Sequence, residues 1–190
     1  MSPEDASAIA QVHGNDPVLA APEAADGAAL WSLAREAGSL DVNSPYSYLL
    51  WCRDFAATSV IARDGDRLAG FVTGFVRPNA TDTLFVWQVA VAPSHRRRGL
   101  ARRMLDHLVE SLAPQGIRYI EATVTPSNES STRLFTSFAA ANGTEPVTDV
   151  LFAEKLFPQA TEESPDHGHE PEVLFRIGPI GRSGAPVAGG

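Results

Sequence analysis

The residues with the clearest chemical signal are 96–101, three arginines, a glycine, a leucine and an alanine. They follow an apolar, β-branched run that breaks at Pro93, and an amphipathic stretch begins with them. A strand, a short loop and a helix are therefore expected in that order. A helix N-terminus offers free backbone N–H groups and a partial positive charge, so it binds anions. Glycine allows close backbone approach and the arginines add charge. The predicted anion site comprises Arg96, Arg97, Arg98, Gly99, Leu100 and Ala101.

The loop differs from the two common nucleotide-binding motifs. A P-loop requires the pattern GxxxxGK[ST], a dinucleotide fold requires GxGxxG, and the chain has neither. The pattern here is Arg-x-x-Gly-x-Ala, directly after a strand that ends in V-A-V-A-P. A basic loop that merely caps an ordinary strand–helix turn is the alternative, but such a loop does not need this spacing.

Two regions carry candidate proton acceptors. Glu121 lies inside the apolar run 119–124, and buried carboxylates are rare unless they are paired. The alternative for Glu121 is a position at a sheet edge that faces solvent. His169 and His167 lie in a polar segment, where plain solvent exposure is the alternative. These histidines have no visible set of further ligands, so no metal site is predicted.

A polar segment at residues 40–48 has the composition of a wall for a small ligand. Asp41 could pair with an ammonium group, and Asn43 and Tyr46 could bind polar groups. A helix cap followed by a buried tyrosine is the alternative interpretation of the same residues.

The elements that must position these residues alternate in a recognisable order. Apolar patterns and turn residues predict a β-α-α-β-β-β-α-β-α-β-β chain, typical of an α/β (α+β) sandwich with helices covering a central sheet. The expected strands are 18–21, 58–63, 67–76, 84–91, 119–124, 145–151 and 173–177, and the expected helices are 25–37, 44–56, 99–112 and 129–141. Residues 17–180 are expected to form one domain, between a disordered segment at 1–16 and a flexible tail at 181–190.

Composition narrows the function classes. The chain has 190 residues, a formal net charge of −8 and one cysteine. The negative charge disfavours general nucleic-acid binding, and one cysteine allows no intrachain disulfide framework. No apolar run approaches the ~18 residues that a membrane span needs, and the N-terminus lacks the apolar region of a signal peptide. We expect a cytoplasmic protein that binds neither nucleic acid nor membranes.

The loop at 96–101, together with the strand before it and the helix after it, resembles the acetyl-CoA pyrophosphate loop of the GNAT acetyltransferases. The resemblance implies the GNAT fold, with a mixed, mostly antiparallel sheet, and acetyl-CoA as co-substrate. It implies that backbone groups of Val89 and Val91 hold the pantetheine arm and the acetyl oxygen. Asn128 is expected to cap the next helix and to contact the cofactor. Phe135 stands where these enzymes often carry a tyrosine that protonates the departing thiolate, so solvent would take that role.

Four further segments make the resemblance narrower. LDVNSPYSYLL, DTLFVWQVAV, IEATVTPSN and HEPEVLFRIGP are similar to segments of the diaminobutyrate acetyltransferases of ectoine biosynthesis, and the similarity runs from about residue 25 to 180. It implies transfer of acetyl from acetyl-CoA to the γ-amine of L-2,4-diaminobutyrate, by direct attack without a covalent enzyme intermediate. It also implies a homodimer. The acceptor pocket would be lined by Asp41, Tyr46, Trp87, Glu121 and His169.

Other functions remain open at this point. A GNAT enzyme for another small amine would keep the cofactor loop, but the segment at 40–48 argues against it. A non-catalytic acyl-CoA-binding sensor could lose Glu121 and His169, which this chain retains. A protein N-terminal or lysine acetyltransferase would need an open peptide groove. Glu121, His169 and water all remain candidates for the proton acceptor.

Overall fold

The computed structural model describes residues 16–38, 40–158 and 168–180. The expectations for residues 1–15 and 181–190, and the candidate His167, lie outside these ranges. None of the helices in the described ranges is both long and apolar enough to cross a membrane.

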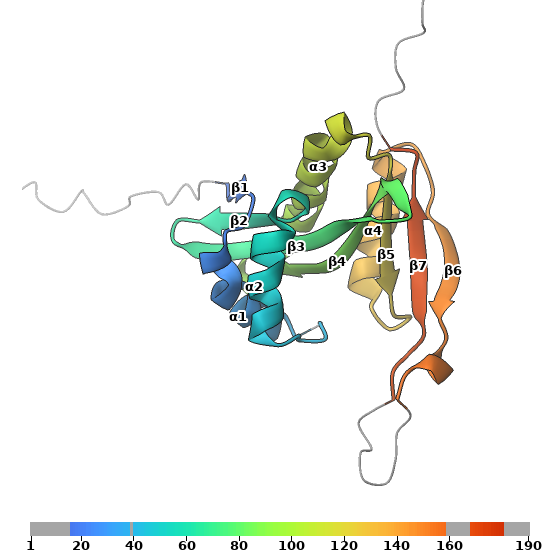
Figure 1. Ribbon diagram of the computed structural model, residues 1–190, viewed down its shortest axis with the longest axis horizontal. Helices are drawn as coiled ribbons and strands as arrows, with labels where there is room; N and C mark the ends of the chain where they lie inside the picture. Colours follow the sequence, from blue (N-terminus) through green and yellow to red (C-terminus); the bar gives the residue numbers. More distant parts are fainter. Residues whose placement is uncertain (1–15, 39, 159–167, 181–190) are drawn as a thin grey trace, which may run out of the picture.

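A seven-stranded sheet, in the order β1-β2-β3-β4-β5-β7-β6, forms the centre of the protein (Figure 1). Only the β4–β5 pair is parallel among the pairs of this sheet, so the sheet is mixed and mostly antiparallel. The predicted fold class and element order are confirmed. The strands are β1 (Val18–Ala20), β2 (Val60–Asp64), β3 (Arg67–Arg77), β4 (Ala80–Val91), β5 (Tyr119–Val124), β6 (Val147–Phe152) and β7 (Glu172–Ile177). The helices are α1 (Gly27–Ala37), α2 (Pro45–Asp54), α3 (Leu100–Leu112) and α4 (Glu129–Ala141), with short 3-10 turns between elements.

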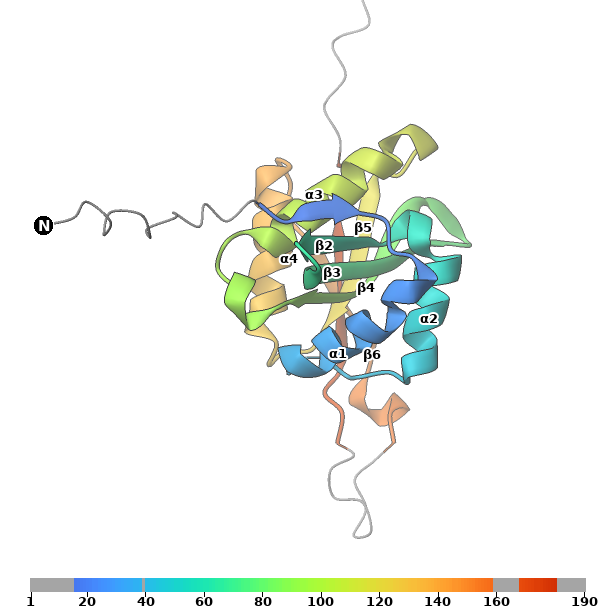
Figure 2. The same cartoon turned by 90° about the vertical axis from the view of Figure 1, so that its left-hand side faces the viewer.

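Two hydrophobic cores lie on opposite faces of the sheet. One joins α3 and α4 to the strands and includes Met104 and Phe138. The other joins α1 and α2 to β2, β3 and β4 and includes Leu30 and Tyr48. Figures 1 and 2 show the two helix pairs on either side of the sheet. Successive β3 residues point to opposite faces, so Val72 enters the first core and Phe71 the second.

Local signals account for the helix ends that frame the site. Ser44 caps α2 by accepting a hydrogen bond from the Ser47 N–H, and Pro45 occupies the first helical turn. Gly38 ends α1 with a φ of 67°, a conformation that glycine adopts without steric cost. Asn128 caps α4 by accepting from the Ser131 N–H at 3.1 Å. These residues fix the end of α1 and the starts of α2 and α4 beside the site.

Strand β4 begins at Ala80, four residues before the predicted start at residue 84. Ala80 is followed by three consecutive polar residues, Thr81, Asp82 and Thr83, so the start of β4 lies outside the apolar run on which the prediction rests. The Arg77–Ala80 pair places them in a tight hairpin with β3. The extra length gives β4 the reach to pair with both β3 and β5.

Candidate active site

Strand β4 parts from β5 halfway along its length. The parallel pairing runs from Thr83 and Tyr119 to Val86 and Ala122, yet β4 continues to Val91 and β5 to Val124. On its other side, β4 has a register shift against β3 that makes Trp87 the extra residue of a bulge. A bulge bends its strand and increases its twist. The ends of β4 and β5 therefore diverge just after the bulge.

The divergence exposes backbone groups of β4. The Ala92 N–H donates to the Ala69 carbonyl of β3 at 2.8 Å. Because N–H groups of a strand alternate in direction, those of Val89 and Val91 point to the side from which β5 has parted. Donors held in this way can bind an amide chain or polarise a carbonyl oxygen.

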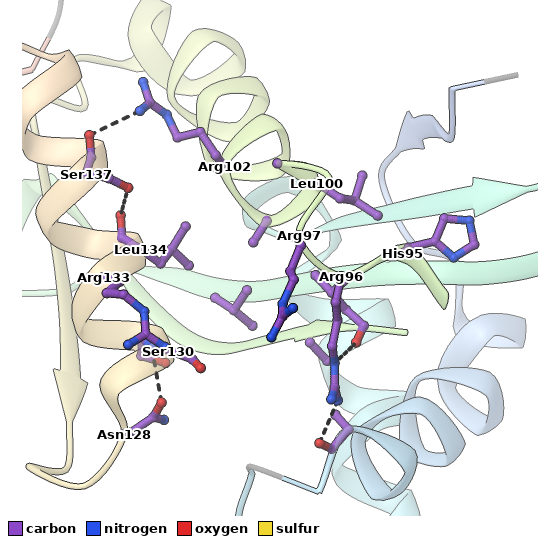
Figure 3. Close-up of a pocket in the computed structure, with 17 residues that line it drawn as sticks. His95, Arg96, Arg97, Leu100, Arg102, Asn128, Ser130, Arg133, Leu134 and Ser137 are labelled. Carbon is purple, nitrogen blue, oxygen red and sulfur yellow. Dashed lines mark hydrogen bonds between the residues drawn. The ribbon is translucent and has the colours of Figure 1, made fainter. Parts of the chain in front are cut away.

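A cavity of about 630 Å³ opens at the divergence, between the loop after β4 and helix α4 (Figure 3). It is lined from the β4 side by backbone and side chains of Val89, Ala90 and Val91. Eight of the nine predicted cofactor residues line it, namely Val89, Val91, Arg96, Arg97, Gly99, Leu100, Ala101 and Asn128. The ninth, Arg98, lies instead on a separate small pocket beside Asp16 and Arg103.

The loop before α3 has the backbone of an anion site. Arg97 and Gly99 both adopt left-handed conformations, with φ values of 60° and 73°. Such turns point consecutive N–H groups toward one side, and α3 begins at the next residue with its free N–H groups. Arg97 extends from the loop into the cavity (Figure 3). A phosphate group would meet backbone donors, a helix N-terminus and a guanidinium together.

Arg96 lies on the cavity but its guanidinium is engaged with the protein. Nη2 donates to the Ala37 carbonyl at 2.8 Å, and Nε donates to the Val91 carbonyl at 3.3 Å (Figure 3). Ala37 is the last residue of α1, where backbone carbonyls carry a partial negative charge that favours a cation. Arg96 therefore joins the anion loop to the end of α1.

Helix α4 contributes cavity residues that the sequence did not single out. Ser130, Ser131 and Arg133 line the cavity beside Asn128. They lie in the first turns of α4, directly after its cap Asn128. The helix-cap pattern that identified Asn128 could therefore also have identified them. Phe135 is buried, with its ring centroid 6.3 Å from that of Phe175. Its position belongs to the core.

Glu121 is held by two arginines. Its Oε2 accepts from Arg77 Nη1 at 2.5 Å, its Oε1 accepts from Arg176 Nη1, and the side chain is 2% exposed. Arg176 also lies over the Tyr119 ring at 4.2 Å. Both oxygens of this buried carboxylate are thus occupied by charge-assisted hydrogen bonds. This geometry suits an ion-pair centre better than a group that must accept a proton during turnover.

The structure brings Asp41 and His169 together. Asp41 Oδ2 lies 3.4 Å from His169 Nε2, and Glu172 Oε1 lies 3.7 Å from the same atom. Asp41 is also held through its backbone, because its carbonyl accepts from Gln88 Nε2 at 2.9 Å. Gln88 directly follows Trp87, so the connection between α1 and α2 meets β4 beside the bulge.

The remaining predicted acceptor residues, Trp87, Tyr46 and Asn43, are wholly or partly accessible to solvent. Trp87 is 48% exposed and stacks on Trp51, with 6.1 Å between ring centroids. Tyr46 is 66% exposed and Asn43 is partly buried. The buried tyrosine of this segment is Tyr48.

The environment of His169 favours its charged form. The hydrogen bond to the Glu170 carbonyl raises the pKa of His169 most, desolvation opposes it, and the carboxylates of Asp41 and Glu172 raise it further, so that the net shift is upward. Its ring stacks on Phe157, with 4.0 Å between centroids. Within the described ranges, no group of three or more His, Cys, Asp or Glu side chains is arranged to hold a metal ion.

The profile of the Acetyltransferase (GNAT) family matches residues 28–139. The chain belongs to the GNAT acetyltransferase family. The match spans both β4 and the anion loop, so the cavity lies at the centre of the GNAT region.

Three relatives show how far the similarity extends. An L-2,4-diaminobutyric acid acetyltransferase of Streptomyces coelicolor is 53% identical over 165 residues, which is 86% of this chain and 93% of the relative. The protein of the same name from Shouchella clausii is 45% identical over 85% of this chain and 86% of its own. The structure of diaminobutyrate acetyltransferase EctA from Paenibacillus lautus, in complex with L-2,4-diaminobutyric acid and coenzyme A, has a TM-score of 0.81 and 43% identity. It covers 90% of this chain and 100% of that one.

A change of charge at Gly99 tests the anion loop of this GNAT protein. A Cβ at Gly99 would meet no atom within 4 Å, so a side chain there would not clash with the protein. Asparagine tolerates left-handed backbone and has the shape of aspartate. We expect Gly99→Asp to raise the Kd for acetyl-CoA about 10- to 100-fold more than Gly99→Asn does, because only aspartate repels a phosphate. Isothermal titration calorimetry measures both.

The matched control is Gly116→Asp, which places the same charge at a left-handed glycine beyond the other end of α3. It should leave the acetyl-CoA affinity near that of the wild type. Equal affinities for the Gly99→Asp and Gly99→Asn variants would remove the loop from the cofactor site.

Proposed function

We propose that this protein is an acetyltransferase that moves the acetyl group of acetyl-CoA to the γ-amine of L-2,4-diaminobutyrate, giving N-γ-acetyl-diaminobutyrate for ectoine biosynthesis. The observation that carries the proposal is the similarity, over 90% of this chain, to EctA, whose structure holds diaminobutyric acid and coenzyme A. The named relatives at 53% and 45% identity support the same activity. We infer one catalytic domain at residues 17–180, acting in the cytoplasm.

The described residues fit acetyl-CoA as the acetyl donor. The loop at 96–101 and the N-terminus of α3 suit the pyrophosphate. The outward N–H groups of Val89 and Val91 suit the pantetheine amides and the acetyl oxygen, and the cavity is large and basic enough for a phosphorylated arm. Asn128 and its neighbours on α4 form the opposite wall.

Transfer then requires the amine nitrogen to attack the thioester carbon. A carbon–nitrogen bond forms, the carbon–sulfur bond breaks, the amine loses a proton and the thiolate gains one. A backbone N–H of β4 stabilises the negative charge that develops on the carbonyl oxygen. Phe135 has no acidic proton, so solvent supplies the proton for the thiolate.

The acceptor side has the charge that a diamine needs. The carboxylates of Asp41 and Glu172 lie near the ring of His169. Trp87 is the bulged residue of β4, the strand whose N–H groups suit the acetyl donor. A carboxylate pairs with the spare ammonium, while Asn43 and Tyr46 bind polar groups. Of the two protein groups considered as proton acceptors, His169 is the better placed, because the oxygens of Glu121 are already held by two arginines.

The activity test is a thiol-release assay with acetyl-CoA and a panel of amines. The panel contains L-2,4-diaminobutyrate, ornithine, lysine, spermidine and a short peptide, and NMR identifies the acetylated nitrogen. We expect turnover with diaminobutyrate, at least about 10-fold above each other amine in kcat/KM, and acetylation at the γ position. Preference for another amine would overturn the acceptor assignment, and acetyl-CoA binding without turnover would favour a sensor.

The pH profile tests His169 as the proton acceptor. The pKa of His169 is raised, so its neutral form prevails only above a pH higher than the ordinary histidine value of about 6.5. If neutral His169 accepts the proton, kcat falls as pH decreases through that raised pKa. We expect His169→Gln to lower kcat about 10²-fold and to remove this limb.

Glu121→Gln provides the comparison. It removes the charge that pairs with Arg77 and Arg176, so its main effect should be a lower Tm, by roughly 3–10 °C, with the acid limb of kcat intact. Loss of the limb in Glu121→Gln and its retention in His169→Gln would reverse the two roles.

We propose a homodimer that forms through β6. This strand ends the sheet, every one of its residues is exposed, and its apolar side chains include Val147 at 71% and Val150 at 53% exposure. Exposed apolar edge strands are normally covered, and antiparallel pairing of two β6 strands about a two-fold axis would cover both. Asp149 is the one charge on the strand.

Light scattering after size exclusion measures the oligomeric state. We expect twice the chain mass of 20.3 kDa for the wild type and a monomer for the double variant Val147→Lys, Val150→Lys. Val18→Lys, at the exposed edge strand β1, is the control and should remain a dimer. A monomeric wild type, or a dimeric double variant, would refute this interface.

A further inference from the structure

Two side chains of β4 and the loop after it bond carbonyl groups at the two ends of the α1–α2 connection, Ala37 at the wall of the donor cavity and Asp41 beside His169. Gln88, on β4, donates from Nε2 to the Asp41 carbonyl at 2.9 Å. Arg96, in the anion loop, donates from Nη2 to the Ala37 carbonyl at 2.8 Å. Ala37 ends α1, and Asp41 lies in the connection that leads to α2. The connection between α1 and α2 is thus held at both of these points by residues that flank Val89 and Val91.

The burial of Gln88 indicates a specific role for its amide. The side chain is 8% exposed, and its Oε1 has no hydrogen-bond partner among the described residues. Thr73 Oγ1, on the register partner of Gln88, likewise has no partner in the described ranges. Burial raises the pKa of Tyr48, whereas hydrogen bonding with Gln88 and Asn43 lowers it by less. Buried polar atoms without partners are unfavourable, and a leucine at this position would leave fewer of them. Besides its interaction with the Tyr48 hydroxyl, the Gln88 amide donates from Nε2 to the Asp41 carbonyl.

The orientation of Arg96 is also informative. It lies in a cluster whose charge suits a phosphate, yet its guanidinium bonds two backbone carbonyls, Ala37 and Val91. Arg97 is the arginine that extends into the cavity (Figure 3). Arg96 can contribute its backbone to the anion site while its side chain connects the anion loop, the end of β4 and the end of α1.

We propose that Gln88 and Arg96 are positioning residues that fix the α1–α2 connection to strand β4 and the loop after it. Binding of acetyl-CoA to β4 and this loop then strengthens binding of the amine. The inference rests on the proposed function for the identity of the amine. Gln88 sets the position of Asp41, whose carboxylate contacts His169. Arg96 extends from the loop that meets the pyrophosphate and bonds the last carbonyl of α1, so a donor that restrains this loop also restrains the end of α1. Because such coupling is reciprocal, the amine strengthens binding of the donor by the same factor.

The experiment measures this coupling directly in the full-length protein. Isothermal titration calorimetry gives the Kd of coenzyme A alone and with saturating L-2,4-diaminobutyrate, and the Kd of diaminobutyrate with and without coenzyme A. Steady-state kinetics give both KM values and kcat. The variants are Arg96→Lys, which keeps the charge but lacks the planar fork, and Gln88→Leu, which removes the donor without changing charge.

We expect the wild type to show a coupling factor of at least about 5, the low end of typical values. In both variants the factor should fall to about 1 and the KM for diaminobutyrate should rise about 10-fold, while the Kd of coenzyme A measured alone changes by less than about 2-fold. Retained affinity for coenzyme A also shows that each variant is folded. Arg35→Lys, an exposed arginine of α1, is the control and should keep the wild-type coupling.

The proposal is overturned by any of four results. A weaker affinity of Arg96→Lys for coenzyme A, with unchanged KM for the amine, would make Arg96 a phosphate ligand. A wild type with no coupling, or variants with wild-type coupling, would make both residues structural only. If the wild type prefers another amine of the panel, the assignment of diaminobutyrate as the substrate fails, but the coupling proposal does not. The same variants are then measured with that amine, and a protein that acetylates none of the panel overturns both proposals.

Discussion

The parting of β4 from β5 after Val86 and Ala122 is the constraint on which the rest of the site depends. Unpaired backbone groups away from water are unfavourable, so a sheet that gives up part of one ladder needs a polar partner for it. The bulge at Trp87 turns β4 aside, and the cavity opens where the ladder ends. A substrate arm with amide groups can restore the lost hydrogen bonds. The site for the acetyl donor therefore lies where β4 lacks the hydrogen bonds that β5 would otherwise supply.

The paired half of β5 is stabilised where the free half begins. Glu121 lies opposite Phe85 on β4 and opposite Arg176 on β7, next to the last paired residues. Its two arginines reach it from the end of β3 and from β7, so one carboxylate links three strands by charge-assisted hydrogen bonds. The divergence starts one residue beyond this cluster. This cluster of Glu121, Arg77 and Arg176 fixes the position at which β4 and β5 diverge.

Local features of the chain were predictable because their causes are local. Gly38, Ser44 and Asn128 end or cap helices through contacts within a few residues, and the loop at 96–101 carries its charge and its glycine in one run. Together with the apolar patterns, those signals were sufficient for the element order and the fold class, and they located the loop that lines the cavity.

The features that could not be predicted from the sequence are contacts between residues that lie far apart along the chain. Glu121 was recognised as a carboxylate in an apolar strand, but its partners Arg77 and Arg176 are 44 and 55 residues away. The bulge at Trp87 depends on the register of β4 against β3, which a single strand does not encode. Arg96 was grouped with the anion-binding arginines on its type, whereas its side chain bonds a carbonyl 59 residues away.

The distribution of charge around β4 gives the two substrates different sides. The chain is acidic overall, yet the loop after β4 concentrates three arginines at the helix N-terminus. On the other side of the strand, Asp41 and Glu172 lie around His169. A polyanionic donor is attracted to the first side and repelled by the second, and a cationic diamine meets the opposite preference. Gln88 and Arg96 bond the Asp41 and Ala37 carbonyls from the same stretch of chain, so both charge environments are fixed relative to β4. Donor and acceptor are thus oriented by one strand, which suits a reaction whose rate depends on the approach of one nitrogen to one carbon.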